Sequence, residues 1–304
     1  MLNRKVRRNF NLILGFVIIL GFICLFIFSK FSVNKSTNSL VDSSFKNLIK
    51  NSNNLENVVK NTLQGTKGAY SVVIKNLKTN ETYFLNERKL YKAGSLYKLW
   101  IMAVAFKQIQ EGIIDESESL SGDIVELNKK SNINKEDAEL KEGEINFSVA
   151  SALRQMITIS HNYAALLLTE KVKLSKVKEF IKEHNFNETT IGMELPITTA
   201  FDTYLFLEKL YKGELGSSEN TQKMLNSLKD QTLNDKIPKY LPKGTVIAHK
   251  TGELNFLSHD AGIVYSSNGD YIIVVMSEST SSAVAEDVIA KISKSVFDYF
   301  TNSK

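Results

Sequence analysis

The sequence contains few of the residues that cross-link or interrupt a chain. Among 304 residues there are one cysteine, Cys24, and three prolines. A single cysteine cannot form an intramolecular disulfide, so a disulfide-stabilised scaffold is excluded. The chain has no internal repeat and no low-complexity block, which argues against an array of modules. Its length suits one large domain or two closely packed lobes.

The excess of positive over negative charge is also small. The formal net charge is +5, and Arg4, Lys5, Arg7 and Arg8 supply most of it, so the rest of the chain is nearly neutral. This balance is too weak for a nucleic-acid-binding surface. We therefore expect no nucleic-acid partner.

Two groups of catalytic motifs are missing. The four histidines do not form the H-x-H-x-D or H-E-x-x-H patterns of zinc hydrolases. The G-x-S-x-G elbow of the α/β-hydrolases is also absent from the sequence. We expect neither a metal nor a cofactor, and we interpret His249 and His259 as hydrogen-bonded structural residues.

A membrane segment is predicted near the N-terminus. The run Leu12–Ser29 carries no charge and has about the minimum length for a helix that spans a bilayer. More positive residues precede it than follow it, which orients the N-terminus toward the cytoplasm. A cleaved signal peptide is the alternative, but no small-x-small cleavage site ends the run. We predict a cytoplasmic tail and single-pass signal anchor at 1–31, a polar tether at 32–44 and an extracytoplasmic folded domain at 45–304.

Hydrophobic periodicity predicts an α+β fold built from both ends of the chain. Strand-like runs lie near residues 70–85 and 246–276, and helical spacing dominates between them. Helical segments at 45–63 and 283–299 flank these runs. The simplest arrangement is an antiparallel five-stranded sheet flanked by the two terminal helices, with an all-α lobe inserted at about 107–215. The active site would lie between the sheet and this lobe.

A candidate nucleophile lies where the first strands are followed by a helix. Ser95-Leu96-Tyr97-Lys98 is an S-x-x-K motif, and the other S-x-x-K matches lie in or beside the tether or among lysines. Only Ser95 precedes a strongly apolar helix, predicted at 96–109, on which positions i and i+3 share a face. The helix N-terminus favours a developing oxyanion, and burial would lower the pKa of Lys98 so that its amine can act as a base.

Two further motifs follow in order. The segment Ser160–Asn162 is an S-x-N sequence at a polar break between two apolar helical runs. A hydroxyl there can relay a proton, and an amide can bind a substrate amide. Lys250-Thr251-Gly252 ends a strand-like run, where a lysine and a hydroxyl suit a substrate carboxylate. The glycine lets a substrate backbone approach closely.

Together these motifs resemble the three signatures of class A β-lactamases and penicillin-binding proteins. The residues before the S-x-N motif, 152–159, and those after K-T-G, 259–265, also resemble the flanking sequences of that group. The resemblance extends from about Phe45 to the C-terminus. It implies a β-lactamase/transpeptidase-like fold and a serine-acyl mechanism.

The resemblance implies the residues that perform acylation. Ser95 would be acylated, and Lys98 would accept the proton of its hydroxyl. Ser160 would pass a proton to the leaving nitrogen. The backbone N–H groups of Ser95 and Glu253 would form the oxyanion hole.

The resemblance also implies the residues that bind substrate. Asn162 would bind the side-chain amide of the substrate. Lys250 and Thr251 would bind its carboxylate, next to Gly252. The expected partner is a small-molecule β-lactam or a peptidoglycan stem peptide.

The sequence departs from class A enzymes between Asn162 and Lys250. Those enzymes carry an ordered omega loop with an E-x-x-L-N motif, whose glutamate activates the deacylating water, and this loop is shortened here. The segment Glu183–Asn187 imitates the motif but ends a lysine-rich helix. Glu194 lies where the shortened loop should be and is the candidate for deacylation. His161 stands where class A enzymes usually have aspartate.

Three functions remain open from the sequence. The first, favoured by the resemblance, is serine-dependent hydrolysis of the β-lactam amide through a Ser95 acyl-enzyme. The second is D-alanyl peptidase activity on peptidoglycan stem peptides with the same residues. The third is a β-lactam-binding protein that deacylates slowly. The missing loop glutamate counts against fast release of the acyl group, but it does not count against acylation.

Overall fold

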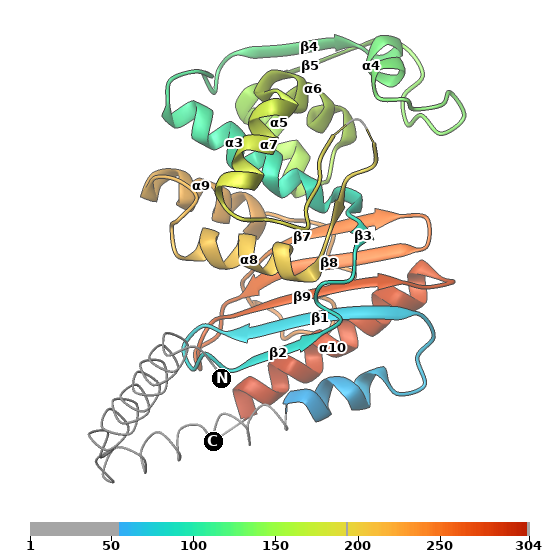
Figure 1. Cartoon of the computed structure of the whole chain (residues 1–304), viewed down its shortest axis with the longest axis vertical. Helices are drawn as coiled ribbons and strands as arrows, with labels where there is room; N and C mark the ends of the chain where they lie inside the picture. Colours follow the sequence, from blue (N-terminus) through green and yellow to red (C-terminus); the bar gives the residue numbers. More distant parts are fainter. Residues whose placement is uncertain (1–54, 193, 303–304) are drawn as a thin grey trace, which may run out of the picture. The chain divides into compact units, whose positions relative to one another are not determined.

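The computed structural model of the chain describes residues 55–192 and 194–302 (Figure 1). The predicted signal anchor at 1–31, the tether at 32–44 and the first residues of the folded domain lie outside these ranges. Within them, no helix is both long and apolar enough to cross a membrane.

An antiparallel sheet of five strands combines both ends of the described chain, as the sequence predicts. The strand order is β2-β1-β9-β8-β7. Strand β1 pairs with β9 over its whole length, from Ala69 opposite Glu278 to Asn76 opposite Tyr271. The strands are β1 (Ala69–Asn76), β2 (Thr82–Leu85), β7 (Ile247–Leu254), β8 (Leu257–Val264) and β9 (Tyr271–Glu278).

Both faces of the sheet are covered, which explains the unbroken apolar run in β9. Residues 271–277 are all buried. Successive side chains of a strand point to opposite faces, so Ile272 and Val274 belong to one hydrophobic core while Ile273 and Val275 belong to another. The sheet therefore separates two cores, each closed by helices.

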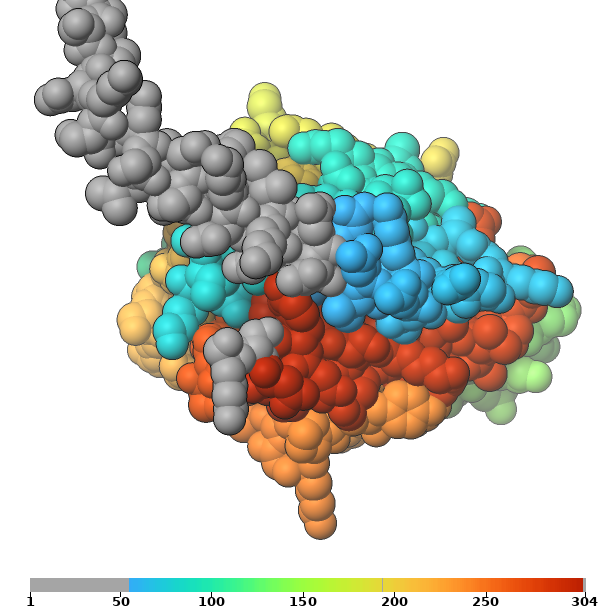
Figure 2. Space-filling model, turned by 90° about the horizontal axis from the view of Figure 1, so that it is seen from below, coloured from blue at the N-terminus to red at the C-terminus, as the bar shows by residue number. Residues whose placement is uncertain are grey.

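One face is covered by the helices at the two ends of the described chain, residues 55–63 and α10 (Ser282–Asn302). Figure 2 shows these segments side by side, and Thr62 Oγ1 donates to Ser295 Oγ at 3.2 Å. The apolar side chains that they bury include Leu55, Val59, Val288, Ile292 and Val296.

The other face is covered by the helices between β3 and β7, which we call the helical lobe (Figure 1). Its central helix α3 (Lys98–Gln110) is buried on all sides along its first two turns because other helices surround it. Trp100 packs there against the rings of Phe186 and Phe206. The other helices of the lobe are η1 (Gly94–Tyr97), α4 (Ile124–Lys130), α5 (Val149–Thr158), α6 (Asn162–Val172), α7 (Leu174–Glu183), α8 (Ala200–Tyr211) and α9 (Ser218–Lys229).

The lobe predicted at about 107–215 is mainly helical, but it also carries a ribbon that we did not expect. Strand β4 (Ser119–Asp123) pairs with β5 (Glu144–Ser148). The β4 sequence SLSGD has one apolar residue and no β-branched residue, so it gives no strand signal. A second ribbon joins β3 (Tyr91–Lys92) to β6 (Ile197–Thr198), whose two-residue strands are too short to show periodicity.

His259 on β8 ties the sheet to β3, just before the candidate nucleophile. Its Nδ1 accepts a hydrogen bond from the Ser277 N–H at 3.1 Å, so the neutral ring donates through Nε2 to the Lys92 carbonyl at 3.0 Å. Burial lowers the pKa of His259 to about 4. The structural role that we predicted for this histidine is confirmed by these contacts.

Acid pH should therefore destabilise the fold through His259. The unfolded chain takes up this proton near pH 6.5, whereas the folded ring resists it until about pH 4. We expect the free energy of unfolding to fall by about 3 kcal/mol between those limits, measured by urea denaturation. His259→Gln should remove this part of the slope and the control His184→Gln should keep it. An unchanged slope in His259→Gln would contradict the assignment.

Candidate active site

Ser95 lies in the short 3₁₀ helix η1, directly before α3. The helix predicted at 96–109 therefore begins as a 3₁₀ turn, and the α-helix proper begins at Lys98. Ser95 is partly exposed, whereas Lys98 is 0% exposed. The candidate nucleophile is thus open to solvent while its candidate base is not.

The turn that carries Ser95 packs against the edge strand β7. A Cβ added to Gly94, whose φ is +51°, would lie 2.7 Å from the backbone nitrogen of Glu253. A Cβ added to Gly252 would lie 2.7 Å from the carbonyl oxygen of Ala93. The two N–H groups predicted to form the oxyanion hole therefore belong to segments in direct backbone contact.

Lys98 connects this turn to the S-x-N motif. Its Nζ donates to the carbonyl oxygen of Ser160 at 2.6 Å and to Oδ1 of Asn162 at 2.7 Å, and it lies 3.2 Å from Ser160 Oγ. The two motifs are 62 residues apart in the chain but adjacent in space. Packing of α3 against α5 and α6 brings them together.

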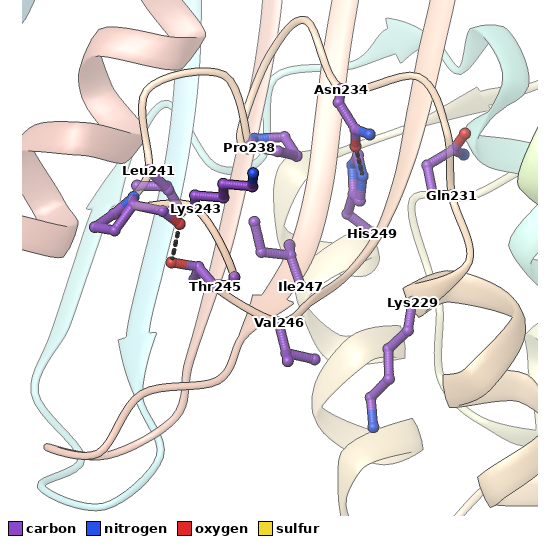
Figure 3. A pocket seen from close by; sticks show the side chains of 12 residues that line it. Lys229, Gln231, Asn234, Pro238, Leu241, Lys243, Thr245, Val246, Ile247 and His249 are labelled. Carbon is purple, nitrogen blue, oxygen red and sulfur yellow. Dashed lines mark hydrogen bonds between the residues drawn. The ribbon is translucent and has the colours of Figure 1, made fainter.

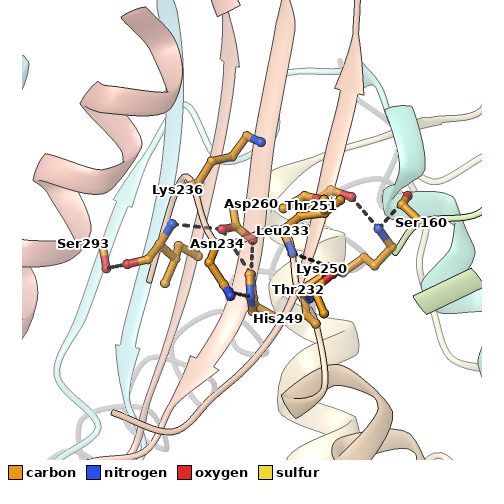
Figure 4. Close-up of polar contacts among 12 residues, drawn as sticks. Ser160, Thr232, Leu233, Asn234, Lys236, His249, Lys250, Thr251, Asp260 and Ser293 are labelled. Carbon is orange, nitrogen blue, oxygen red and sulfur yellow. Dashed lines mark hydrogen bonds and ion pairs between the residues drawn. The ribbon is translucent and has the colours of Figure 1, made fainter. Parts of the chain in front are cut away.

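Lys250 reaches the same hydroxyl from β7. Its Nζ donates to Ser160 Oγ at 2.9 Å and to the carbonyl oxygen of Thr251 at 2.9 Å (Figure 4). Ser160 Oγ therefore lies between the amines of Lys98 and Lys250, and both lysines are 0% exposed. A hydroxyl that contacts two amines can pass a proton between them.

Burial lowers the pKa of both lysines because a charged amine loses its hydration. The pKa of Lys98 falls to about 7, and the carboxylate of Glu139 opposes this shift. The pKa of Lys250 also lies well below its ordinary value, through burial and then through the charge of Lys98. Close cations repel, so the pair favours loss of one proton near neutral pH, as an amine base requires.

Ser160 has a φ of +58°, which is uncommon for a residue other than glycine. This conformation turns the chain between α5 and α6 so that both its hydroxyl and its carbonyl meet Lys98. His161 then caps the N-terminus of α6, where its Nδ1 accepts from the Ala164 N–H at 3.3 Å. Burial lowers the pKa of His161, which keeps this acceptor unprotonated.

The predicted substrate-binding residues differ in exposure. Asn162 is exposed at the start of α6, while Thr251 is only 2% exposed on β7. The exposed carboxylate of Glu253 forms an ion pair with Lys236, whose side chain is 2% exposed. Lys236 therefore fixes the strand segment that carries one predicted oxyanion donor.

Glu194 lies in the short connection before β6 and is exposed. Nearby, the carbonyl oxygen of Pro196 accepts from the Ala93 N–H at 2.7 Å, so the connection runs beside the segment that leads to Ser95. Among the described residues, no hydrogen bond joins Glu194 to Lys98 or to the other members of the site.

The sequence did not reveal Gly94, Lys236 or Glu139 as parts of this site. Gly94 had a usable signal, because it directly precedes the motif serine. Lys236 and Glu139 had none, since each lies in a polar stretch with no motif and reaches its partner only through the fold. Glu139 Oε1 accepts from Asn162 Nδ2 at 2.5 Å.

A hollow of about 420 Å³ opens beside His249, the residue before Lys250 (Figure 3). Its walls come from residues 229–249, and they do not include Ser160 or the paired lysines. The His249 ring is held by Asp260 Oδ1, at 3.0 Å from Nδ1, as expected for a structural histidine. The candidate site is therefore the cluster around Ser160. No metal-binding cluster of His, Cys, Asp or Glu is present in the described part of the chain.

Gly94→Ala tests the contact between the nucleophile turn and β7. The added methyl would lie 2.7 Å from the Glu253 nitrogen and should widen the oxyanion hole, so we expect a roughly 10²- to 10³-fold loss of acylation rate. Gly112→Ala is the matched control, because Gly112 has a φ of +69° but nothing within 4 Å of an added Cβ. It should share the backbone strain, seen as a lower Tm, without the loss of rate. Equal rate losses in both variants would refute the oxyanion explanation.

Comparison with known proteins agrees with this geometry. Residues 54–300 match the family described as "Beta-lactamase enzyme family". Beta-lactamase VEB-1 of Pseudomonas aeruginosa is 20% identical over 277 residues, covering 82% of this chain and 91% of the relative. The structure of TLA-3 extended-spectrum beta-lactamase is 27% identical with a TM-score of 0.71, covering 82% of this chain and 98% of that chain.

A second solved structure is that of PBP-A, which is 22% identical with a TM-score of 0.72 and covers 82% of this chain and 96% of that chain. A PBP-A mutant has also been solved as an acyl-enzyme complex with penicillin G. The family match extends over most of the described residues and includes every element that carries the Ser160 cluster. The chain therefore belongs to the β-lactamase enzyme family.

Proposed function

We propose that Ser95 is the nucleophile with which this serine hydrolase of the β-lactamase type opens the β-lactam amide. The observation that carries the proposal is the shared hydroxyl of Ser160, which lies 3.2 Å from Lys98 Nζ and 2.9 Å from Lys250 Nζ. This arrangement offers a route for the serine proton to reach the leaving nitrogen.

Acylation follows from these contacts. Neutral Lys98 takes the proton from Ser95 Oγ as this oxygen bonds to the carbonyl carbon. The negative charge that develops on the carbonyl oxygen is stabilised by the N–H groups of Ser95 and Glu253. The C–N bond then breaks, and Ser160 gives its proton to the nitrogen while it takes one from Lys98 or Lys250. The product is an ester on Ser95.

Binding of the substrate uses the two ends of the same cluster. The cation of Lys250 and the hydroxyl of Thr251 would hold the substrate carboxylate on β7. Asn162 is exposed and has a second Nδ2 hydrogen free to donate to a side-chain carbonyl. Gly252, predicted to give room to a substrate backbone, instead admits the turn that carries Ser95, because an added Cβ would lie 2.7 Å from the Ala93 carbonyl oxygen.

Release of the acyl group requires a water and a base. We propose Glu194 for this role, because its connection runs beside the segment that leads to Ser95. Glu194 is exposed, so it can exchange protons with solvent directly.

A second candidate function is a D-alanyl peptidase that acts on peptidoglycan stem peptides. We base it on the connection between α7, which ends at Glu183, and β6, which begins at Ile197, where we expect a shortened omega loop that lacks the deacylating glutamate of class A enzymes. Similarity to PBP-A, of which a mutant has been solved as an acyl-enzyme with penicillin G, is in keeping with this alternative. Both functions use the same acylation residues and differ in which acyl group is released.

We also propose that the enzyme works outside the cytoplasmic membrane, tethered by Leu12–Ser29. The support is the uncharged apolar run and the excess of positive residues before it. The expected result is that the full chain stays with membranes after alkaline carbonate extraction and that external protease removes the domain from intact spheroplasts. Release of the full chain into the carbonate supernatant would contradict the anchor.

Ser95→Ala tests the nucleophile. We incubate the full-length chain with a chromogenic cephalosporin and follow hydrolysis and intact mass together. The wild type should turn over substrate and carry a transient adduct that peptide mapping assigns to Ser95. The variant should carry no adduct and should hydrolyse the substrate at least about 10³-fold more slowly. An adduct of unchanged amount in Ser95→Ala would refute the assignment.

The same assay separates release from acylation. Glu194→Gln should form the adduct at the wild-type rate and lose it at least tenfold more slowly. Glu136→Gln, an exposed carboxylate elsewhere in the lobe, is the control and should behave as wild type. Unchanged adduct lifetime in Glu194→Gln would exclude Glu194 from release. A persistent adduct in the wild type itself would favour the peptidase or the slowly deacylating binding protein.

A further inference from the structure

The described structure supplies one carboxylate at the S-x-N motif that the proposed mechanism does not use. Glu139 Oε1 accepts a hydrogen bond from Asn162 Nδ2 at 2.5 Å. On its other side, the Asn162 amide accepts from Lys98 Nζ through Oδ1 at 2.7 Å. Asn162 therefore bridges a buried amine and an exposed carboxylate.

This bridge allows only one orientation of the Asn162 amide. In the observed orientation, the oxygen faces a donor on Lys98 and the NH₂ group faces an acceptor on Glu139. A flipped amide would set its NH₂ group against the donors of Lys98 and its oxygen against the carboxylate. Both contacts would then be repulsive, so the two neighbours together fix the amide.

The loop that carries Glu139 is itself fixed beside Asn162. The next residue, Leu140, donates its N–H to the hydroxyl of Tyr163 at 3.0 Å. The carbonyl oxygen of Leu140 accepts from Asn128 Nδ2 at 2.9 Å. Since Tyr163 follows Asn162 on α6 and is 2% exposed, its hydroxyl ties the loop to the start of that helix.

We propose, on the basis of the function proposed above, that Glu139 is a positioning residue of the active site. It orients the amide of Asn162 and, through that amide and its own negative charge, holds Lys98 for proton transfer. The second hydrogen of Asn162 Nδ2 stays available to the side-chain carbonyl of an acylamino substrate. Glu139 thus acts both on the amide that binds the substrate carbonyl and on the protonation of the base Lys98.

The charged groups around Lys98 determine in which direction removal of the Glu139 charge changes the pKa of Lys98. Lys250 on β7 and His161 before α6 are both coupled to the charge of Lys98, and the Tyr97 ring lies 6.0 Å from its Nζ. Glu139 is the carboxylate that acts on the pKa of Lys98, and it opposes the lowering caused by burial. Removal of its charge should therefore lower the pKa of Lys98 further.

The experiment compares three variants of the full-length chain. Glu139→Gln keeps an acceptor oxygen and removes the charge, and Glu139→Ala removes both. Glu136→Gln is the control, because it removes one exposed charge from the same loop. Acylation rates are measured against pH with benzylpenicillin and with 6-aminopenicillanic acid, which lacks the side-chain amide. Melting temperatures are recorded for all variants.

Glu139→Gln should move the acid limb of the acylation rate to lower pH, by an amount that shrinks in high salt because the carboxylate is exposed. Glu139→Ala should in addition slow acylation by benzylpenicillin about tenfold relative to 6-aminopenicillanic acid. Glu136→Gln should match wild type in both respects. Titration of the Lys98 amine by lysine-selective NMR should show the same downward shift without substrate.

An acid limb and a Lys98 titration that are unchanged in Glu139→Gln would overturn the proposal, as would equal slowing of both substrates in Glu139→Ala. If Glu139→Ala has a much lower melting temperature than the wild type, its rates are set aside and the proposal is judged on Glu139→Gln. Failure of the proposed function can be distinguished from failure of the Glu139 proposal, because the wild type would then form no Ser95 adduct. The substrate-free NMR titration would still test Glu139 in that case.

Discussion

The structure depends on two lysines that are buried around one hydroxyl. Lys98 from α3 and Lys250 from β7 are both 0% exposed, and both contact Ser160 Oγ. Two charged amines buried here would lose their hydration, so burial lowers both pKa values, and the charge of Lys98 lowers the pKa of Lys250 further. Because burial lowers the pKa of these lysines, the site can supply a neutral amine at physiological pH.

The remaining elements serve to keep those lysines and the nucleophile in register. The edge strand β7 carries Lys250, and β9, the central strand of the sheet, is buried from 271 to 277. Backbone contact through Gly94 brings the nucleophile turn against the same strand. Lys236 holds the outer end of that strand by pairing with Glu253. In this way the sheet contributes Lys250 to the proton path, and the helical lobe contributes Lys98 and Ser160.

Much of this arrangement could be predicted from the sequence. The strand-rich ends, the helical middle and the order of the three motifs indicated the sheet, the lobe and the residues Ser95, Ser160 and Lys250. The β4–β5 ribbon was missed because residues such as Ser119 and Gly122 have no β preference. Lys236 and Glu139 were missed because their roles arise from distant contacts, which no local pattern encodes. The signal anchor stays a prediction, since it lies outside the described residues.

The central claim is that burial makes Lys98 a neutral base at physiological pH. The most direct measurement is an NMR titration of the Lys98 amine in the full-length wild-type enzyme, assigned with Lys98→Arg. The account predicts that the amine loses its proton with an apparent pKa of about 7, because burial removes the hydration of its charged form. A Lys98 amine that stays protonated up to its ordinary pKa near 10.5 would contradict the account.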